Sequence, residues 1–192
     1  MSMVKLNSKQ IAFIAMMGAL GNILAFITIA PTVVKQVALD FSLIPVLIAG
    51  IFGGALIGGL TGIIAGLGPS LLFGFIYGQL GFLGFTLSIG KGIVGVMIGL
   101  LTNYFKPFQR TTWVFIPLVL VAFIPECFWI ILTFSIFVPL FIPSQAALSG
   151  FLIPILVKAW FEIGVMSFFI SALAGHEGFK SFVFSYMSKT NR

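Results

Sequence analysis

The sequence predicts an all-α integral membrane protein: a bundle of six transmembrane helices with both termini in the cytoplasm. Of its 192 residues, 60% are hydrophobic and 7% are charged, whereas about 25% of an ordinary soluble domain is charged. Apolar runs of about 20 residues, long enough to cross a hydrocarbon core, recur along the chain. The net charge of +6 would favour a nucleic-acid partner in a soluble protein. Here most basic residues lie at the ends and in one connector, so we expect membrane lipid and no nucleic acid as a partner.

We expect residues 1–192 to form a single transmembrane domain. Four of its helices are continuous apolar runs, at about 10–30, 85–105, 113–138 and 151–174. The first run follows two lysines and resembles the core of a signal peptide. However, it is about twice the usual length and meets Pro31 instead of a small-residue cleavage site, so we interpret it as a retained span.

The apolar, glycine-rich stretch 43–84 predicts two further short helices, at about 43–56 and 59–78, with a turn near Gly53–Gly59. Five of its glycines are spaced four residues apart: Gly50, Gly54, Gly58, Gly62 and Gly66. This spacing lets helix backbones approach closely, which indicates tight packing within the subunit. The same spacing would also suit one continuous helix.

The basic residues predict the orientation of the spans. They gather before the first run, in the connector 106–112 and at the C-terminal end. The positive-inside rule therefore places both termini and this connector in the cytoplasm. The stretch 43–84 must then cross an even number of times, as two helices or as a re-entrant hairpin. We expect a multi-pass protein of the plasma membrane with six helices.

Four ionisable residues lie inside the apolar runs: Lys91, Glu126, Lys158 and Glu162. A charge at membrane depth is costly unless it is paired or faces a cavity, so these residues predict a ligand site. Two bases and two acids favour a small polar ligand that is neutral or zwitterionic. The four-residue spacing of Lys158 and Glu162 allows them to pair on one helix face. A structural ion-pair network that ties the last three helices together is the alternative.

Further features support a pocket near these charges. Pro125 breaks one helical hydrogen bond beside Glu126, which is tolerated at membrane depth mainly next to protein or a wet cavity. Aromatic side chains could stack on a flat heteroaromatic ligand. The aromatic candidates for ligand contact are Trp129, Trp160, Tyr77 and Phe85.

The sequence does not predict an enzyme, and we expect no catalytic residues, no cofactor and no metal site. The segment Gly84–Gly92 resembles a phosphate-binding loop, but it has five residues between its first two glycines and no Ser or Thr after Lys91. Catalytic motifs such as H-E-x-x-H and G-x-S-x-G are also absent from the sequence.

The first helix carries a smooth strip of small residues on one face, formed by Ala12, Ala15 and Ala19 with Asn22 beyond them. Such a strip suits docking of another helix, in this subunit or in a partner. The segment Ala15-Met-Met-Gly-Ala19 resembles the A-x-x-x-A signature of S components. These are the substrate-binding membrane subunits of energy-coupling factor (ECF) vitamin transporters. The segment 39–54 is similar to the start of their second helix.

This resemblance implies a substrate-capture subunit of an ATP-driven importer. It would bind a vitamin from outside, in a pocket in the outer half of the membrane covered by the loop 31–42. Its partners would be a transmembrane coupling protein, docked on Ala15 and Ala19, and two cytoplasmic ATPase subunits. The four ionisable residues inside the apolar runs would contact the ligand. The stretch from Leu39 to Pro45 is most similar to riboflavin-type members, whereas Gly84–Ser88 is similar to folate-type members.

Two other classes of function remain open from the sequence. A stand-alone secondary transporter of a small polar solute would use Glu126 or Glu162 to carry a proton. A structural or assembly subunit would use the glycines of 50–66 to pack against partners and would bind no small molecule.

Overall fold

The computed structural model describes residues 6–32, 39–107 and 112–188. Within these ranges every regular element is a helix and there is no strand, which confirms the all-α class. Five helical stretches of the described chain are long and apolar enough to cross a membrane: Ser8–Ile29, Ala55–Ile76, Gly81–Phe105, Thr112–Phe141 and Pro143–Gly175. The chain is therefore a multi-pass membrane protein. Six spans, one domain and cytoplasmic termini stay predictions.

The first half of the chain runs through α1 (Ser8–Thr32), α2 (Leu43–Gly53), α3 (Ala55–Ala65), α4 (Leu67–Leu71) and the π-helical turn η1 (Leu72–Ile76). The second half follows as the 3-10 turn η2 (Gly81–Gly84), α5 (Phe85–Phe105), the 3-10 turn η4 (Thr112–Val114), α6 (Phe115–Leu132), the π-helical turn η5 (Thr133–Phe137), α7 (Val138–Phe141), η6 (Pro143–Phe151), α8 (Leu152–Gly175) and α9 (Glu177–Ser188).

The predicted break in the glycine-rich stretch occurs at one residue. Gly54 has a positive φ of 83°, a conformation that glycine adopts without steric cost, and it separates α2 from α3. Of the two helices predicted within 43–84, the later one, α3, therefore starts at Ala55 and not at 59. With 11 residues, α2 is about 16 Å long at 1.5 Å per residue, about half of a hydrocarbon core.

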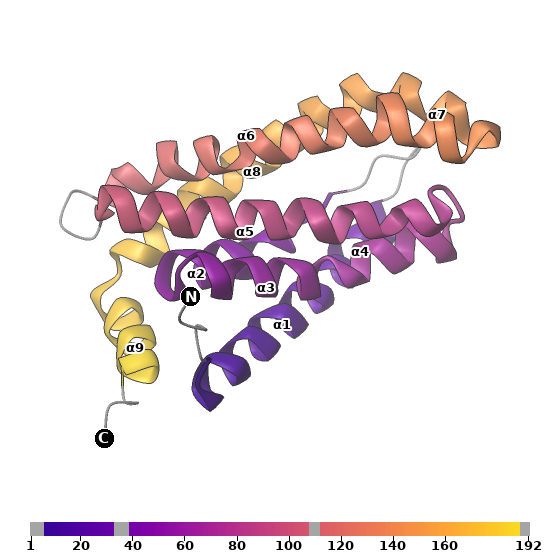
Figure 1. Cartoon of the computed structure of the whole chain (residues 1–192). Helices are drawn as coiled ribbons and strands as arrows, with labels where there is room; N and C mark the ends of the chain where they lie inside the picture. Colours follow the sequence, from indigo (N-terminus) through magenta and orange to yellow (C-terminus); the bar gives the residue numbers. More distant parts are fainter. Residues whose placement is uncertain (1–5, 33–38, 108–111, 189–192) are drawn as a thin grey trace, which may run out of the picture.

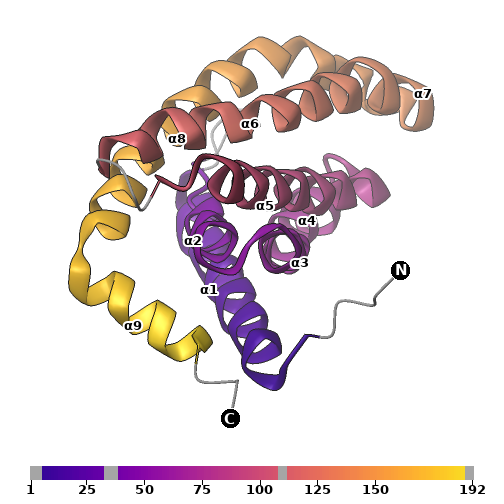
Figure 2. The same ribbon diagram turned by 60° about the vertical axis from the view of Figure 1, so that its left-hand side comes forward.

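Three layers of helices build the bundle (Figure 1). The first layer is α1, the second holds α2, α3 and α4, and the third holds α6, α7 and α8, with α5 between the second and the third. The second view separates the third layer clearly from α5 and shows α9 along the flank of the bundle, next to α1 (Figure 2). The sequence did not predict α9. It packs by edge contacts of Phe179 and Phe184 on Phe52 of α2.

Glycines hold α3 directly against α5. A Cβ added to Gly58 would lie 2.3 Å from the carbonyl oxygen of Gly95, and one added to Gly62 would lie 2.3 Å from that of Lys91. Side chains at these positions would therefore force the two backbones apart. The glycine spacing thus serves packing within the subunit, as the sequence indicated. This contact also fixes the position of Lys91, which lies on the same part of α5.

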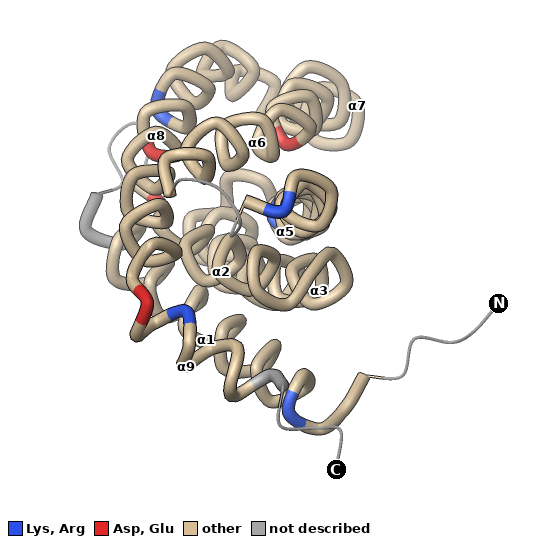
Figure 3. Tube along the Cα trace, turned by 90° about the vertical axis from the view of Figure 1, so that its left-hand side faces the viewer, with Lys and Arg blue, Asp and Glu red and all other residues tan. Residues whose placement is uncertain are grey.

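The start of α1, the end of α5 and α9 lie at one end of the bundle, which Figure 3 shows from outside. Lys9, Lys106 and Lys180 belong to these segments. The three predicted basic clusters are thus represented at a common end, although several of their members lie outside the described residues. Elsewhere along the helices, Figure 3 shows few charged positions. Those inside the bundle gather around one cavity.

Candidate functional site

A cavity of about 140 Å³ lies between α5, α6 and α8. The segment before α2 and the segment 73–80 close it further. A single water needs about 10–15 Å³, so the cavity has room for a small organic ligand.

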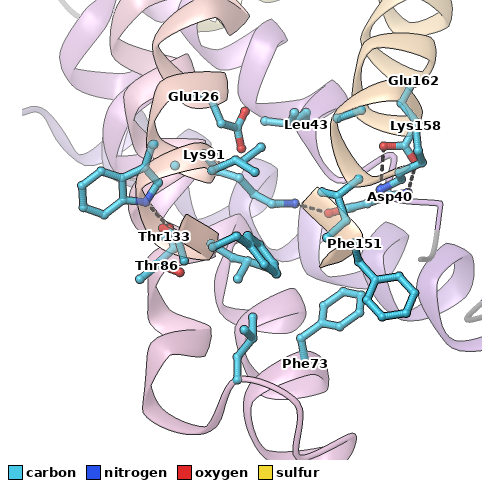
Figure 4. A pocket seen from close by; sticks show the side chains of 18 of the residues that line it. Asp40, Leu43, Phe73, Thr86, Lys91, Glu126, Thr133, Phe151, Lys158 and Glu162 are labelled. Carbon is cyan, nitrogen blue, oxygen red and sulfur yellow. Dashed lines mark hydrogen bonds and ion pairs between the residues drawn. The ribbon is translucent and has the colours of Figure 1, made fainter. Parts of the chain in front are cut away.

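The wall combines charged, hydroxyl and aromatic side chains (Figure 4). Its charged and hydroxyl residues are Asp40, Thr86, Lys91, Glu126, Thr133, Lys158 and Glu162. Its aromatic residues are Phe73, Phe123, Trp129, Phe134 and Phe151. Phe73 and Phe151 lie near each other, away from the Glu126 end. The cavity wall therefore mixes hydrogen-bonding groups with aromatic surfaces.

Lys91 forms the first ion pair of the wall. Its Nζ lies 2.6 Å from Oδ2 of Asp40, and it also donates to the hydroxyl of Ser42. The side chains of Lys91 and Asp40 are 4% and 16% exposed, so the pair is largely removed from solvent. Asp40 Oδ1 accepts a hydrogen bond from the Ser42 backbone NH at 2.9 Å. These contacts join α5 to the start of α2.

Lys158 and Glu162 form the second ion pair, on α8. Lys158 Nζ lies 2.8 Å from Glu162 Oε2, as the four-residue spacing predicts. The other oxygen, Glu162 Oε1, accepts a hydrogen bond of 2.6 Å from the backbone NH of Asp40. Burial raises the pKa of the Asp40 carboxyl, but the charges of Lys91 and Lys158 outweigh it and hold this pKa below its ordinary value. Asp40 thus connects both ion pairs.

Glu126 lines the same cavity without such a partner. It is 8% exposed, and its Oε2 has no hydrogen-bond partner among the residues that the structure describes. In Figure 4 it extends into the cavity from α6 beside the side chain of Lys91, and no dashed line reaches it. The charged wall therefore contains two matched pairs and one additional carboxyl.

Trp129 lies one turn beyond Glu126 on α6 and is fixed by a hydrogen bond. Its Nε1 donates to the backbone oxygen of Thr86 at 2.8 Å, which ties α6 to α5. Gly90 of α5 faces both side chains: an added Cβ would lie 3.1 Å from Glu126 Oε1 and 3.3 Å from Trp129 Cδ1. The absence of a side chain at position 90 thus lets Glu126 and Trp129 approach α5.

Three of the predicted aromatic residues do not line the cavity. Trp160 is 41% exposed and packs edge-on against Phe123, because it lies two residues and about 200° around α8 from Glu162. Phe85 is 47% exposed, and its ring packs on Phe75. Tyr77 packs on Phe73, behind the wall. We expected these three residues to contact ligand in the pocket, but none of them is part of the cavity wall. Lys91, Glu126, Trp129, Lys158 and Glu162 do line it.

Sequence reasoning missed Asp40 and most of the aromatic wall. Asp40 stands in a connector before α2, where a lone carboxyl usually indicates a solvated loop. Helical spacing could have found Phe123 and Thr133, which lie three residues before and seven residues after Glu126 and so share its face. Phe73 and Phe151 come from irregular segments and follow no such pattern. Half of the predicted loop cover 31–42, residues 33–38, lies outside the described residues.

The alanine strip of α1 lies outside the bundle core. Ala12, Ala15 and Ala19 are exposed, whereas Gly18 between them packs on Ile64 of α3. Asn22 at the end of the strip is used within the subunit: its Nδ2 donates to the Ile64 oxygen at 2.9 Å, and its Oδ1 accepts from the Gly68 NH at 2.6 Å. The three alanines therefore leave a smooth outer surface.

The comparisons with known proteins agree with this architecture. A family model described as "ECF transporter, substrate-specific component" matches residues 9–174, from the first turn of α1 to the last turn of α8. No match was found among curated proteins or among solved structures. Since the family model covers most of the chain, this protein belongs to the family of substrate-specific components of ECF transporters.

Proposed function

We propose that the chain captures a vitamin from outside the cell in the cavity between α5, α6 and α8, in the outer half of the plasma membrane. Members of its family are transport subunits that bind substrate, and they are not enzymes. They work with a membrane coupling protein and ATPases. In this proposal two cytoplasmic ATPases supply the energy, and the coupling protein docks on Ala12, Ala15 and Ala19.

One observation carries the proposal: the four charged residues singled out in the apolar runs all line the same cavity. Residues from α5, α6 and α8 share this wall with five aromatic side chains. A purely structural ion-pair network would explain the two matched pairs, but it would not require an aromatic cavity beside them. Both roles are compatible, because a paired side chain can still present its remaining donors and lone pairs to a ligand.

Riboflavin is the first candidate ligand, from the similarity of Leu39–Pro45 to riboflavin-type members. A flat neutral ring suits a wall that contains Phe73, Phe123 and Trp129. A folate-type ligand is the alternative. The charges of the wall oppose it, because a doubly anionic ligand needs cations without partners, and Lys91 and Lys158 are each paired with a carboxylate.

The experiment is to purify the full chain in detergent and to identify any co-purified small molecule by absorption and mass spectrometry. Titration with riboflavin then measures the affinity. Tight binding of a vitamin supports the proposal. The absence of small-molecule binding would favour an assembly subunit instead.

Reconstitution separates the remaining rival. Vesicles that contain this chain alone are compared with vesicles that also contain the coupling protein and both ATPases. We expect accumulation of ligand only in the complete system and only with ATP. Accumulation by the chain alone, driven by a pH gradient, would instead establish a proton-coupled secondary transporter that uses Glu126 or Glu162.

A further inference from the structure

Two buried polar groups on α6 line the cavity with no hydrogen-bond partner in the described part of the chain: Glu126 Oε2 and Thr133 Oγ1. The two residues are 8% and 2% exposed. Buried polar atoms are almost always hydrogen-bonded, because leaving one unpaired costs most of its lost hydration. Two orphaned groups on the wall of one cavity therefore indicate that something else binds there.

Thr133 differs from two other threonines of the helices, Thr28 and Thr102. Thr102 Oγ1 donates to the Ile98 carbonyl, four residues back, at 2.8 Å, and Thr28 Oγ1 donates to the Leu24 carbonyl at 2.8 Å. Such back-bonding is the usual solution for a threonine in a helix. Thr133 does not use it, and it begins the π-helical turn η5. Turns of this kind occur often at functional sites.

The hydroxyl of Thr61 gives a useful contrast. Its Oγ1 is also buried without a partner among the described residues, but Thr61 does not line the cavity. An orphaned hydroxyl therefore occurs in this chain without a ligand site. The cavity wall, shared with Glu126, distinguishes Thr133 from Thr61.

The remaining charges of the wall are already satisfied. Lys91 pairs with Asp40, and Lys158 pairs with Glu162. Among the described wall residues, Glu126 is thus an acid in excess of the two pairs. A ligand that neutralises or hydrogen-bonds this carboxyl gains an interaction that the protein itself leaves unmade. A ligand with an anionic group at this end meets a carboxyl of the same sign.

The spacing of the two orphaned groups gives a length for the ligand. Glu126 and Thr133 are seven residues apart on one helix face, roughly 10 Å of rise at 1.5 Å per residue. Trp129 lies between them on the wall, and its bond to the Thr86 oxygen fixes the indole. A fused-ring heteroaromatic is long enough to reach from one group to the other along this surface.

We propose that Glu126 accepts a hydrogen bond from a nitrogen-borne donor of the substrate, while Thr133 binds a second polar group about two helical turns away. The inference rests on the proposed function and names its substrate class: a flat heteroaromatic ring system with an N–H donor at one edge and no net negative charge. Charge-assisted hydrogen bonds to a buried carboxyl are stronger than neutral ones, so this contact selects the substrate.

Binding to the purified full chain tests the substrate class with three probes. Riboflavin presents a neutral ring N–H, thiamine presents an amino group on a pyrimidine, and pantothenate is an acyclic anion. We expect the wild-type chain to bind riboflavin or thiamine and to bind pantothenate at least tenfold more weakly. Preference for pantothenate would overturn the inference. If none of the three binds, the inference is overturned, whereas vitamin capture still stands if a different vitamin co-purifies with the chain.

Four variants test the two residues. With the probe that binds, Glu126→Gln should weaken affinity about tenfold to a hundredfold, since its amide oxygen accepts only a neutral hydrogen bond in place of a charge-assisted one. Thr133→Val should weaken affinity about threefold to tenfold, since it removes the hydroxyl. The matched controls are Glu177→Gln, which changes an exposed acid of α9, and Thr61→Val, which removes the orphaned hydroxyl outside the cavity. Both should stay within about twofold of wild type.

A stability measurement separates binding from structure. Because neither Glu126 Oε2 nor Thr133 Oγ1 has a partner within the described chain, both cavity variants should keep or raise the melting temperature without ligand. Wild-type affinity in Glu126→Gln would overturn the inference and leave vitamin capture standing. A lower melting temperature together with lost binding would overturn it as well, since that outcome assigns Glu126 a structural role.

Discussion

Lys91 of α5 forms an ion pair with Asp40, 51 residues earlier in the chain, at 2.6 Å between Nζ and Oδ2. Through its backbone NH, Asp40 also reaches Glu162 of α8. One residue outside the spans thus connects two helices that the cavity separates. The pair and the backbone contact together hold the start of α2 at the cavity.

Breaking this ion pair on one side should destabilise the protein more than removing both charges. Lys91→Met leaves the Asp40 carboxylate without its main partner, and Asp40→Asn does the same to Lys91, so each should cost about 3–5 kcal/mol. The double variant should lose less free energy of unfolding than the sum of the losses in the two single variants. Thermal unfolding in detergent measures this cycle, and additive effects would show that the pair contributes no coupling.

Replacing Glu162 should impair binding more than folding. Glu162→Ala removes both the partner of Lys158 and the acceptor for the Asp40 NH, so the segment before α2 loses this hydrogen bond to α8. We expect ligand binding to be lost, with helix content and monodispersity close to wild type. Glu162→Gln keeps an acceptor for the NH and should bind with intermediate affinity. General unfolding of the alanine variant would favour the structural ion-pair network.

Gly90→Ala should weaken binding without unfolding the chain. The new Cβ would lie 3.1 Å from Glu126 Oε1 and 3.3 Å from Trp129 Cδ1, so both side chains must shift by a few tenths of an ångström. We expect about threefold to tenfold weaker affinity. The matched control is Gly164→Ala on α8, where no atom of the described chain lies within 4 Å of the added Cβ. Equal effects of the two substitutions would mean that the Gly90 contact does not matter.

Gly95→Ala should destabilise the bundle itself. Its Cβ would lie 2.1 Å from the carbonyl oxygen of Gly58, a backbone atom that cannot rotate away, so α3 and α5 must separate. Overpacking of this kind costs about 1–3 kcal/mol or more. A lower melting temperature should therefore accompany this substitution. Gly150→Ala, which meets no described atom within 4 Å, should leave the melting temperature unchanged.

Much of the helical architecture follows from the sequence, because the apolar runs are long and their ends are marked by polar or proline-containing breaks. The predicted span 85–105 coincides with α5, and 151–174 differs from α8 by one residue at each end. The break inside 43–84 was harder to locate, since the four-residue glycine spacing continues through it. Gly54 ends α2 through its positive φ, which leaves no mark in the hydropathy pattern.

The site was predictable only where a charge is unusual for its surroundings. Lys91, Glu126, Lys158 and Glu162 stand out within apolar helices, and all four line the cavity. Asp40 does not stand out, because a carboxyl in a polar connector is ordinary. Trp160 was chosen for its closeness in sequence to Glu162. On a helix, however, two residues of separation place side chains on nearly opposite faces, so three or four would have been the better spacing.

Bulky residues on the alanine strip should stop transport but leave ligand capture intact. Ala15 and Ala19 are exposed and lie on the face of α1 that the bundle does not cover, so Ala15→Trp with Ala19→Trp should block docking of the coupling protein. We expect uptake in cells expressing the complete transporter to fall to background, while affinity of the purified chain stays within about twofold of wild type. The matched control is Ala172→Trp, at an exposed position of α8, which should support normal uptake. Because the strip lies on α1 and the cavity lies between α5, α6 and α8, loss of binding together with uptake would contradict this separation. It would mean instead that α1 packing shapes the cavity.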